Sequence, residues 1–113
     1  MSGQGVRIAT TGLLLAVVAR GAVSQEEIRI EASRSGFKPK VVNLRKGDGV
    51  RLVLTTADEE HCFAVDQLRI EKRIVRGKTT TVGLTVDRPG TYPFHCCLEP
   101  GREAMRGRLV VSE

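Results

Sequence analysis

Most of the side chains that could bind a metal lie in one short segment, YPFHCCLEPGREAM, residues 92–105. It holds a histidine, two cysteines, two glutamates and a methionine, although the whole chain has only two histidines, three cysteines and two methionines. The other histidine, His61, stands beside the third cysteine in DEEHCFAV. Imidazole, thiolate and thioether groups together suit copper, whereas zinc prefers four strong ligands and rarely uses methionine. The residue types therefore indicate a copper site.

Short strands separated by turns must position these side chains. Apolar residues alternate with polar ones in several segments, and turn signals such as KGDG and RPG separate them. No helical periodicity runs longer than a turn or two, although GREAM could make a single turn. The predicted strands include residues 27–33, 50–56, 79–86, 91–96 and 107–113. Several short strands at this spacing predict an all-β protein, either an antiparallel sandwich or a small Greek-key barrel.

The candidate ligands fall into two places that are far apart in the sequence. His61 follows one predicted strand, while Cys96, Glu99 and Met105 lie at or after the end of another. In a sandwich, loops from different strands gather at the same end. The two places could therefore meet in space.

Alternation along the strand that ends at Cys96 separates the two adjacent cysteines. Tyr92, Phe94 and Cys96 share one face of this strand, and His95 and Cys97 share the other. If Phe94 points into the core, Cys96 points toward the same interior end. This parity favours Cys96 over Cys97, and it directs His95 away from the site.

From Gly36 to Val111 the chain resembles a cupredoxin, the small blue-copper fold. GFKPKVVNLRKGDGVRLVLTTADEEHCFAV is similar to the family's first half, with its F-x-P, its K-G-D strand and its H-x-F copper histidine. RGKTTTVGLTVDRPGTYPFHC and MRGRLVV are similar to the later segment and the closing strand. The resemblance implies an antiparallel Greek-key β-sandwich. It also implies His61 as the imidazole ligand, Cys96 as the thiolate and Met105 as the axial thioether.

The loop between Cys96 and Met105 departs from the cupredoxin pattern. Members of that family place a second histidine here, either as C-x-x-H or inside a P-G-H triplet. In this chain Glu99 occupies the first of these positions and Arg102 the second. His95 is the remaining histidine, and it is a less favoured ligand because of its parity.

Three interpretations of the site remain open. In the first, Glu99 replaces the histidine beside His61, Cys96 and Met105, and this harder oxygen ligand favours Cu(II) and lowers the reduction potential. In the second, Cys97 joins Cys96 and the site approaches the two-copper centre of cytochrome oxidase subunit two. That family's spacing is C-x-x-x-C with a later histidine, which adjacent cysteines fit poorly. In the third, the fold has lost its metal and these residues are structural.

The first 24 residues have the layout of a secretory signal. An apolar run covers residues 8–18, small residues lead to Ser24, and no acidic residue occurs before Glu26. We expect cleavage after Ser24 and a periplasmic or secreted domain over residues 25–113. The alternative is an uncleaved anchor at the membrane, although the run is shorter than the roughly 20 residues that cross a bilayer.

The odd number of cysteines leaves at least one thiol unpaired or bound to a metal in an exported chain. A disulfide between the adjacent residues Cys96 and Cys97 would be strained. We hypothesise a structural disulfide between Cys62 and Cys97, which leaves Cys96 free. A disulfide or a metal would help a domain this small, since its core is modest.

Composition and motifs restrict the function. The chain has a formal charge of +5. With one tyrosine, three phenylalanines and no tryptophan, it lacks the aromatic platforms on which nucleic-acid bases stack. The sequence has no nucleophile elbow, zinc-protease motif or phosphate loop, and we expect an electron carrier rather than an independent enzyme. One-electron transfer to a redox partner protein is the leading hypothesis. The alternatives are a module that delivers copper to an acceptor, and a structural domain without metal.

Overall fold

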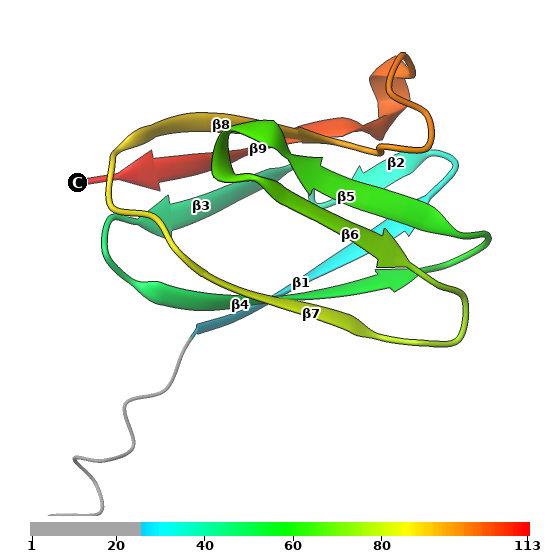
Figure 1. The fold of residues 1–113 in the computed structure, drawn as a ribbon, viewed down its shortest axis with the longest axis horizontal. Helices are drawn as coiled ribbons and strands as arrows, with labels where there is room; N and C mark the ends of the chain where they lie inside the picture. Colours follow the sequence, from blue (N-terminus) through cyan, green and yellow to red (C-terminus); the bar gives the residue numbers. More distant parts are fainter. Residues whose placement is uncertain (1–25) are drawn as a thin grey trace, which may run out of the picture.

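The computed structural model describes residues 26–113, which form a β-sandwich (Figure 1). Within that range the strands are β1 (Glu26–Ser33), β2 (Gly36–Lys38), β3 (Val41–Arg45), β4 (Gly49–Thr56), β5 (His61–Val65), β6 (Ile70–Ile74), β7 (Thr80–Thr85), β8 (Gly90–His95) and β9 (Arg106–Ser112). Two short 3-10 helices, η2 (Asp66–Leu68) and η3 (Glu103–Met105), interrupt the connections. The second of these is the single turn expected in GREAM.

The strands form two sheets, in the orders β2-β1-β4-β7 and β3-β9-β8-β5-β6. The Greek-key β-sandwich expected from the sequence is confirmed. Most neighbouring strands are antiparallel, but β1 pairs with β4 and β3 pairs with β9 in parallel. A tight hairpin imposes antiparallel pairing only on consecutive strands. Because β1 and β4, like β3 and β9, are not consecutive in the chain, no hairpin fixes their relative direction.

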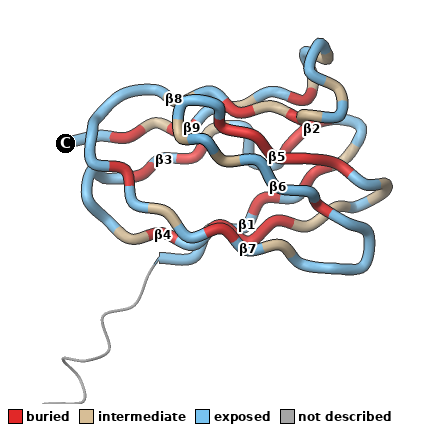
Figure 2. The backbone as a smooth tube through the Cα atoms, in the orientation of Figure 1, coloured by how far each residue is buried: buried red, intermediate tan, exposed pale blue. Residues whose placement is uncertain are grey.

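Buried apolar residues from both sheets form one core cluster, and Figure 2 marks buried residues in red on strands of both sheets. Three phenylalanines meet there: Phe37 and Phe94 pack edge to face at 5.2 Å, and the Phe63 and Phe94 ring centroids lie 4.9 Å apart. Such pairs add to the stabilisation from burial alone. Phe94, the residue whose inward direction the parity argument assumed, is 1% exposed.

Three connections meet at one end of the sandwich, on the right in Figure 1 and opposite the C-terminus. They are the β1–β2 turn, the β4–β5 loop and the segment between β8 and β9. This is the end at which His61 begins β5 and Cys96 follows β8. The fold thus brings together the two groups of candidate ligands.

The predicted signal or anchor over residues 1–24 lies outside the described residues. Among residues 26–113, no helix is long and apolar enough to cross a membrane.

Candidate metal centre

His61, Cys96 and Glu99 bring their ligand atoms together at this end of the sandwich. One nitrogen or oxygen atom from His61 and Glu99 and the sulfur of Cys96 all lie within 4.8 Å of one another. His61 is 1% exposed and Cys96 is fully buried, whereas Glu99 is partly exposed. An imidazole, a free thiol and a carboxylate at this spacing are donor types that a small metal site can use.

The His61 ring is oriented by Asp58, three residues earlier. The Nε2 atom of His61 lies 2.8 Å from Oδ1 of Asp58. Because an ionised carboxylate only accepts hydrogen bonds, Nε2 carries the hydrogen and donates it. Nδ1 is then the ring nitrogen that remains for a metal, an arrangement typical of ligating histidines.

Asp58 is held ionised by several donors. Its carboxylate accepts hydrogen bonds from the Arg34 N–H at 2.9 Å, from the His61 ring and from the Glu59 N–H at 2.6 Å. These bonds, the one from Arg34 foremost, hold the pKa of Asp58 well below its usual range. The β4–β5 loop therefore presents a fixed, negatively charged acceptor to Nε2 of the His61 ring.

The segment from Cys96 to Met105 is closed by backbone hydrogen bonds at a three-residue spacing. The Glu99 N–H donates to the Cys96 carbonyl at 3.0 Å, the Arg102 N–H to Glu99 at 3.1 Å, and the Met105 N–H to Arg102 at 3.0 Å. The Cys96 N–H then donates to the Met105 carbonyl at 3.1 Å and closes the ring. Three of the residues so linked are candidate ligands, and the fourth is Arg102.

Met105 is the last residue of this ring. Its side chain is fully buried and belongs to the same core cluster as Phe94 and Cys96. Met105 is thus buried in the same core as Cys96.

Glu99 is in contact with Arg102, the residue at the position of the triplet histidine in the cupredoxin pattern. Arg102 Nη1 lies 3.1 Å from Oε1 and 3.4 Å from Oε2 of Glu99. Arg102 also donates from Nη2 to the Arg34 carbonyl at 2.7 Å. Sequence reasoning missed the contacts of Arg102 and of the Arg34 backbone. Cys96, Glu99 and Arg102 follow one another at every third position, and this spacing matches the backbone hydrogen bonds that join them.

Cys97 and His95 are placed apart from the three ligand atoms. Cys97 is bonded to Cys62, with their Cα atoms 5.3 Å apart, and this confirms the hypothesised disulfide. Cys96 is the free cysteine of the described residues and is buried. His95 pairs with Ala64 and Arg106 in the sheet and is half-buried. While the disulfide is intact, Cys97 has no thiolate to offer a metal.

The β1–β2 turn packs directly against the ligand segment. Gly36 adopts a φ of +126°, and a Cβ atom there would come within 2.5 Å of the Ala104 carbonyl oxygen. Only glycine fits both the backbone angle and the close approach. Lys40 donates to the same carbonyl at 3.3 Å.

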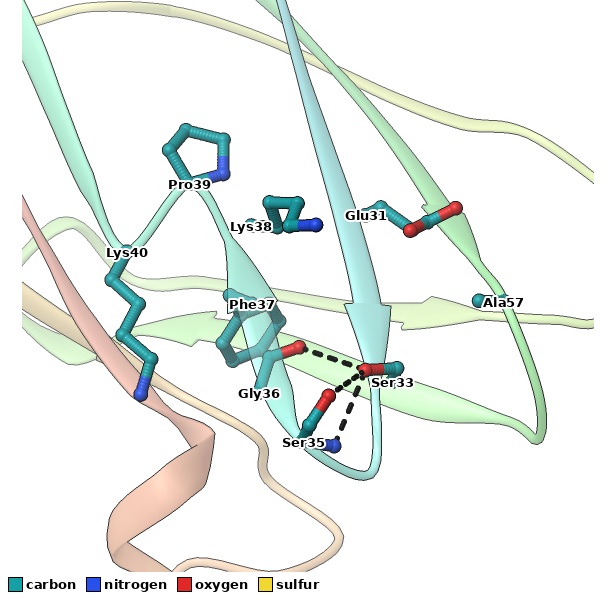
Figure 3. Close-up of a pocket in the computed structure, with 9 residues that line it drawn as sticks. All are labelled: Glu31, Ser33, Ser35, Gly36, Phe37, Lys38, Pro39, Lys40 and Ala57. Carbon is teal, nitrogen blue, oxygen red and sulfur yellow. Dashed lines mark hydrogen bonds between the residues drawn. The ribbon is translucent and has the colours of Figure 1, made fainter.

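A surface pocket of about 470 Å³ lies along this hairpin (Figure 3). Its lining includes Ser33, Ser35 and Gly36 but none of the candidate ligands. Ser33 Oγ lies 2.9 Å from Ser35 Oγ and accepts a hydrogen bond from the Ser35 N–H at 3.2 Å. These bonds stabilise the turn that carries Arg34.

Comparison with known proteins finds curated relatives of this chain. The chain is 30% identical over 92 residues to cytochrome c oxidase subunit 2 from Thermus thermophilus, in a match that spans 80% of this chain and 68% of that protein. In a second curated sequence of that subunit, the chain spans 55% of the length.

Two solved structures share the fold. The metal-binding domain of the Streptococcus pneumoniae Cu(I)-exporting P-type ATPase CopA, solved with Cu(I), superposes with a TM-score of 0.67 at 21% identity, over 77% of this chain and 85% of that one. Auracyanin A, a blue copper protein from Chloroflexus aurantiacus, gives 0.66 at 18% identity, over 78% and 99%. The family model described as a cupredoxin-like domain matches residues 6–111, nearly the whole chain. The chain therefore belongs to the family of cupredoxin-like domains.

Proposed function

We propose that this protein binds one copper ion through His61, Cys96, Glu99 and Met105 and transfers single electrons. The observation that carries the proposal is the meeting of an imidazole, a free thiol and a carboxylate within 4.8 Å at a largely buried place. The residues present fit copper, because soft sulfur and imidazole groups dominate the donor set. A bound copper ion would supply one-electron chemistry through its Cu(I) and Cu(II) states.

Each residue has a separate task in this site. His61 offers Nδ1 while Asp58 holds the other ring nitrogen, and Cys96 offers a buried thiolate. Glu99 supplies a hard oxygen donor, which favours Cu(II), and Met105 supplies a thioether suited to Cu(I). Strands on both sides and the closed backbone ring hold these groups in place, so that their positions change little with the oxidation state.

The relatives support an extracytoplasmic place of action. The periplasmic domain of cytochrome oxidase subunit II from Bradyrhizobium japonicum shares the fold, and the curated relative is a subunit of cytochrome c oxidase. We infer that this domain is periplasmic or secreted and exchanges electrons with a redox partner protein. The single buried thiol favours a mononuclear site, because Cys97 is engaged with Cys62.

A copper-delivery module is the second candidate. His61, Cys96 and Met105 together could hold Cu(I) without redox turnover. The shared fold with a Cu(I)-bound metal-binding domain supports this candidate, since the same sandwich accommodates Cu(I) there. Tight, colourless Cu(I) binding and transfer to an acceptor would favour delivery over electron transfer.

The test is a copper titration of the domain over residues 25–113. Visible absorption and electron paramagnetic resonance spectra are recorded before and after dithionite. We expect a thiolate-to-copper band that bleaches on reduction and returns on oxidation. Absence of stoichiometric copper in the wild-type protein would refute the proposal and favour a structural domain.

Paired variants test the assignment of the thiolate. Cys96→Ser should abolish the coloured species, because it removes the free thiol of the site. The matched variant Cys62→Ala/Cys97→Ala should keep the band, since both of its changes lie in the disulfide. Loss of the band in the second variant alone would show that the parity assignment is wrong.

A further inference from the structure

We propose that Arg102 is a positioning residue that holds the Glu99 carboxylate in place as a copper ligand by tying it to the backbone of the β1–β2 turn. This inference rests on the proposed function and extends it. The cupredoxin pattern has a ligand at the position of Arg102. A guanidinium has only donor N–H groups and stays charged, so Arg102 cannot take the role of the absent imidazole.

Arg102 contacts its two partners through different nitrogen atoms. Nη1 donates to the Glu99 carboxylate at 3.1 Å, and Nη2 donates to the Arg34 carbonyl at 2.7 Å. Both bonds can therefore exist together. The side chains of Arg102 and Glu99 are 39% and 38% exposed, and an isolated ion pair at such exposure contributes little. The bond to Arg34 is what gives the guanidinium a fixed position.

The backbone around Glu99 supports the same arrangement. Glu99 and Arg102 are joined by the backbone bond from the Arg102 N–H to the Glu99 carbonyl at 3.1 Å. Because a carboxylate has two oxygens and about four acceptor sites, Glu99 can accept from Arg102 and still offer a lone pair to a metal. Outer contacts of this kind orient ligating carboxylates and raise metal affinity.

The anchor at Arg34 is itself well fixed. Its carbonyl receives Arg102, while its N–H donates to Asp58, whose carboxylate holds the His61 ring. The bonds of Ser33 to its neighbours stabilise this turn (Figure 3). One residue of the β1–β2 turn thus supports, through its N–H and its carbonyl, the outer contacts of two candidate ligands, His61 and Glu99.

The experiment measures Cu(II) and Cu(I) affinities by chelator competition in a double-mutant cycle of Arg102→Met and Glu99→Gln. We expect Arg102→Met to lower the Cu(II) affinity by about 10–100-fold and to change the Cu(I) affinity much less. In the Glu99→Gln background the same change should have almost no further effect, because its target carboxylate is gone. The Cu(II) electron paramagnetic resonance spectra of Arg102→Met and Glu99→Gln should resemble each other.

Two further variants separate positioning from charge. Arg106→Met is the matched control: Arg106 is exposed and donates to the Pro100 carbonyl at 2.8 Å in the same loop. It removes one positive charge without touching Glu99, and it should leave the affinity and the spectrum unchanged. Arg102→Lys keeps the charge, but a single ammonium group cannot replace the two guanidinium nitrogens that bind Glu99 and the Arg34 carbonyl. It should therefore behave like Arg102→Met.

Three results would overturn the inference. They are an unchanged Cu(II) affinity in Arg102→Met, an equal loss in the Glu99→Gln background, and full rescue by Arg102→Lys. Urea unfolding of the apo variants checks that each is folded. If the wild-type protein retains no copper, the proposed function fails and the inference fails with it. If the wild type binds copper and the cycle shows additive losses, the inference fails alone.

Discussion

Removal of the Cys62–Cys97 disulfide should cost this small domain a large part of its stability. The bond joins residues separated by 35 positions. In the chain-entropy model, closing a loop of that length in the unfolded state corresponds to about 3.8 kcal/mol at 25 °C. Domains typically have about 5–15 kcal/mol in total. The double variant Cys62→Ala/Cys97→Ala should therefore remain folded but be much less stable than the wild type.

The free energy of unfolding is measured by urea titration of the apo protein, because bound copper would add its own stabilisation. With a urea slope of about 1–3 kcal/mol/M, the midpoint should fall by about 1.3–3.8 M. Wild-type protein reduced with dithiothreitol is the control for the alanine substitutions, since it keeps both side chains. The difference between the reduced wild type and the double variant measures packing lost around Cys62, which is fully buried.

The disulfide should also contribute to the metal site. It ties the residue after His61 to the residue after Cys96, and hence it joins the two elements that carry the imidazole and the thiolate. Copper affinity should fall in the double variant while the absorption band persists. If oxidised and reduced wild-type proteins unfold at the same urea concentration, the chain-entropy argument for the stability of the disulfide is refuted.

Three other substitutions test the packing and the outer contacts. Phe94→Ala should destabilise the apo protein by about 3–5 kcal/mol in urea titrations, because the buried Phe94 ring contacts two other aromatic rings. Leu98→Ala is the control, since Leu98 is exposed, and it should change the stability little. Equal effects of the two substitutions would contradict the packing argument. Gly36→Ala should cost about 1–3 kcal/mol, since it meets both a positive φ and a backbone carbonyl of η3; a neutral result by thermal unfolding would show that the turn can shift away. Asp58→Ala should lower copper affinity by about 10–100-fold in chelator competition, because the His61 ring loses its 2.8 Å partner, and an unchanged affinity would mean that packing alone orients the ring.

Much of the sandwich could be predicted from alternation. The strand expected at residues 50–56 is β4 (Gly49–Thr56), and the one expected at 107–113 is β9 (Arg106–Ser112). β5 and β6 were not predicted as strands. All five residues of β5 are buried, so the strand shows no alternation of polar and apolar residues, and a short run of this kind carries no clear period.

The parity argument explains part of the site. Phe94 and Cys96 are both buried while His95 between them is half-buried, as alternation along one strand requires. The pairing of Cys62 with Cys97 follows the same logic, since Cys97 lies on the opposite side from Cys96. Side-chain direction along a regular strand is a local property, and local properties can be read from sequence.

The contacts of Arg102 could not be predicted in the same way. Its bond to the Arg34 carbonyl joins residues 68 positions apart, and the Arg34 bond to Asp58 spans 24 positions. Neither follows a periodic pattern. The first depends on the approach of the β1–β2 turn to the ligand segment, which Gly36 permits, and the second on the approach of the same turn to the β4–β5 loop.

The frame of the ligand segment and its metal chemistry depend on different groups. Backbone N–H and C=O groups close the ring from Cys96 to Met105, and any residue except proline supplies them. Exchanging a histidine for Glu99 or Arg102 therefore leaves the frame intact while it changes the donors. The fold can be preserved across cupredoxin-like domains even when the ligand set is not. In this chain the substituted positions hold a carboxylate and a guanidinium in contact at 3.1 Å, which is why their effect on copper has to be considered as that of a pair.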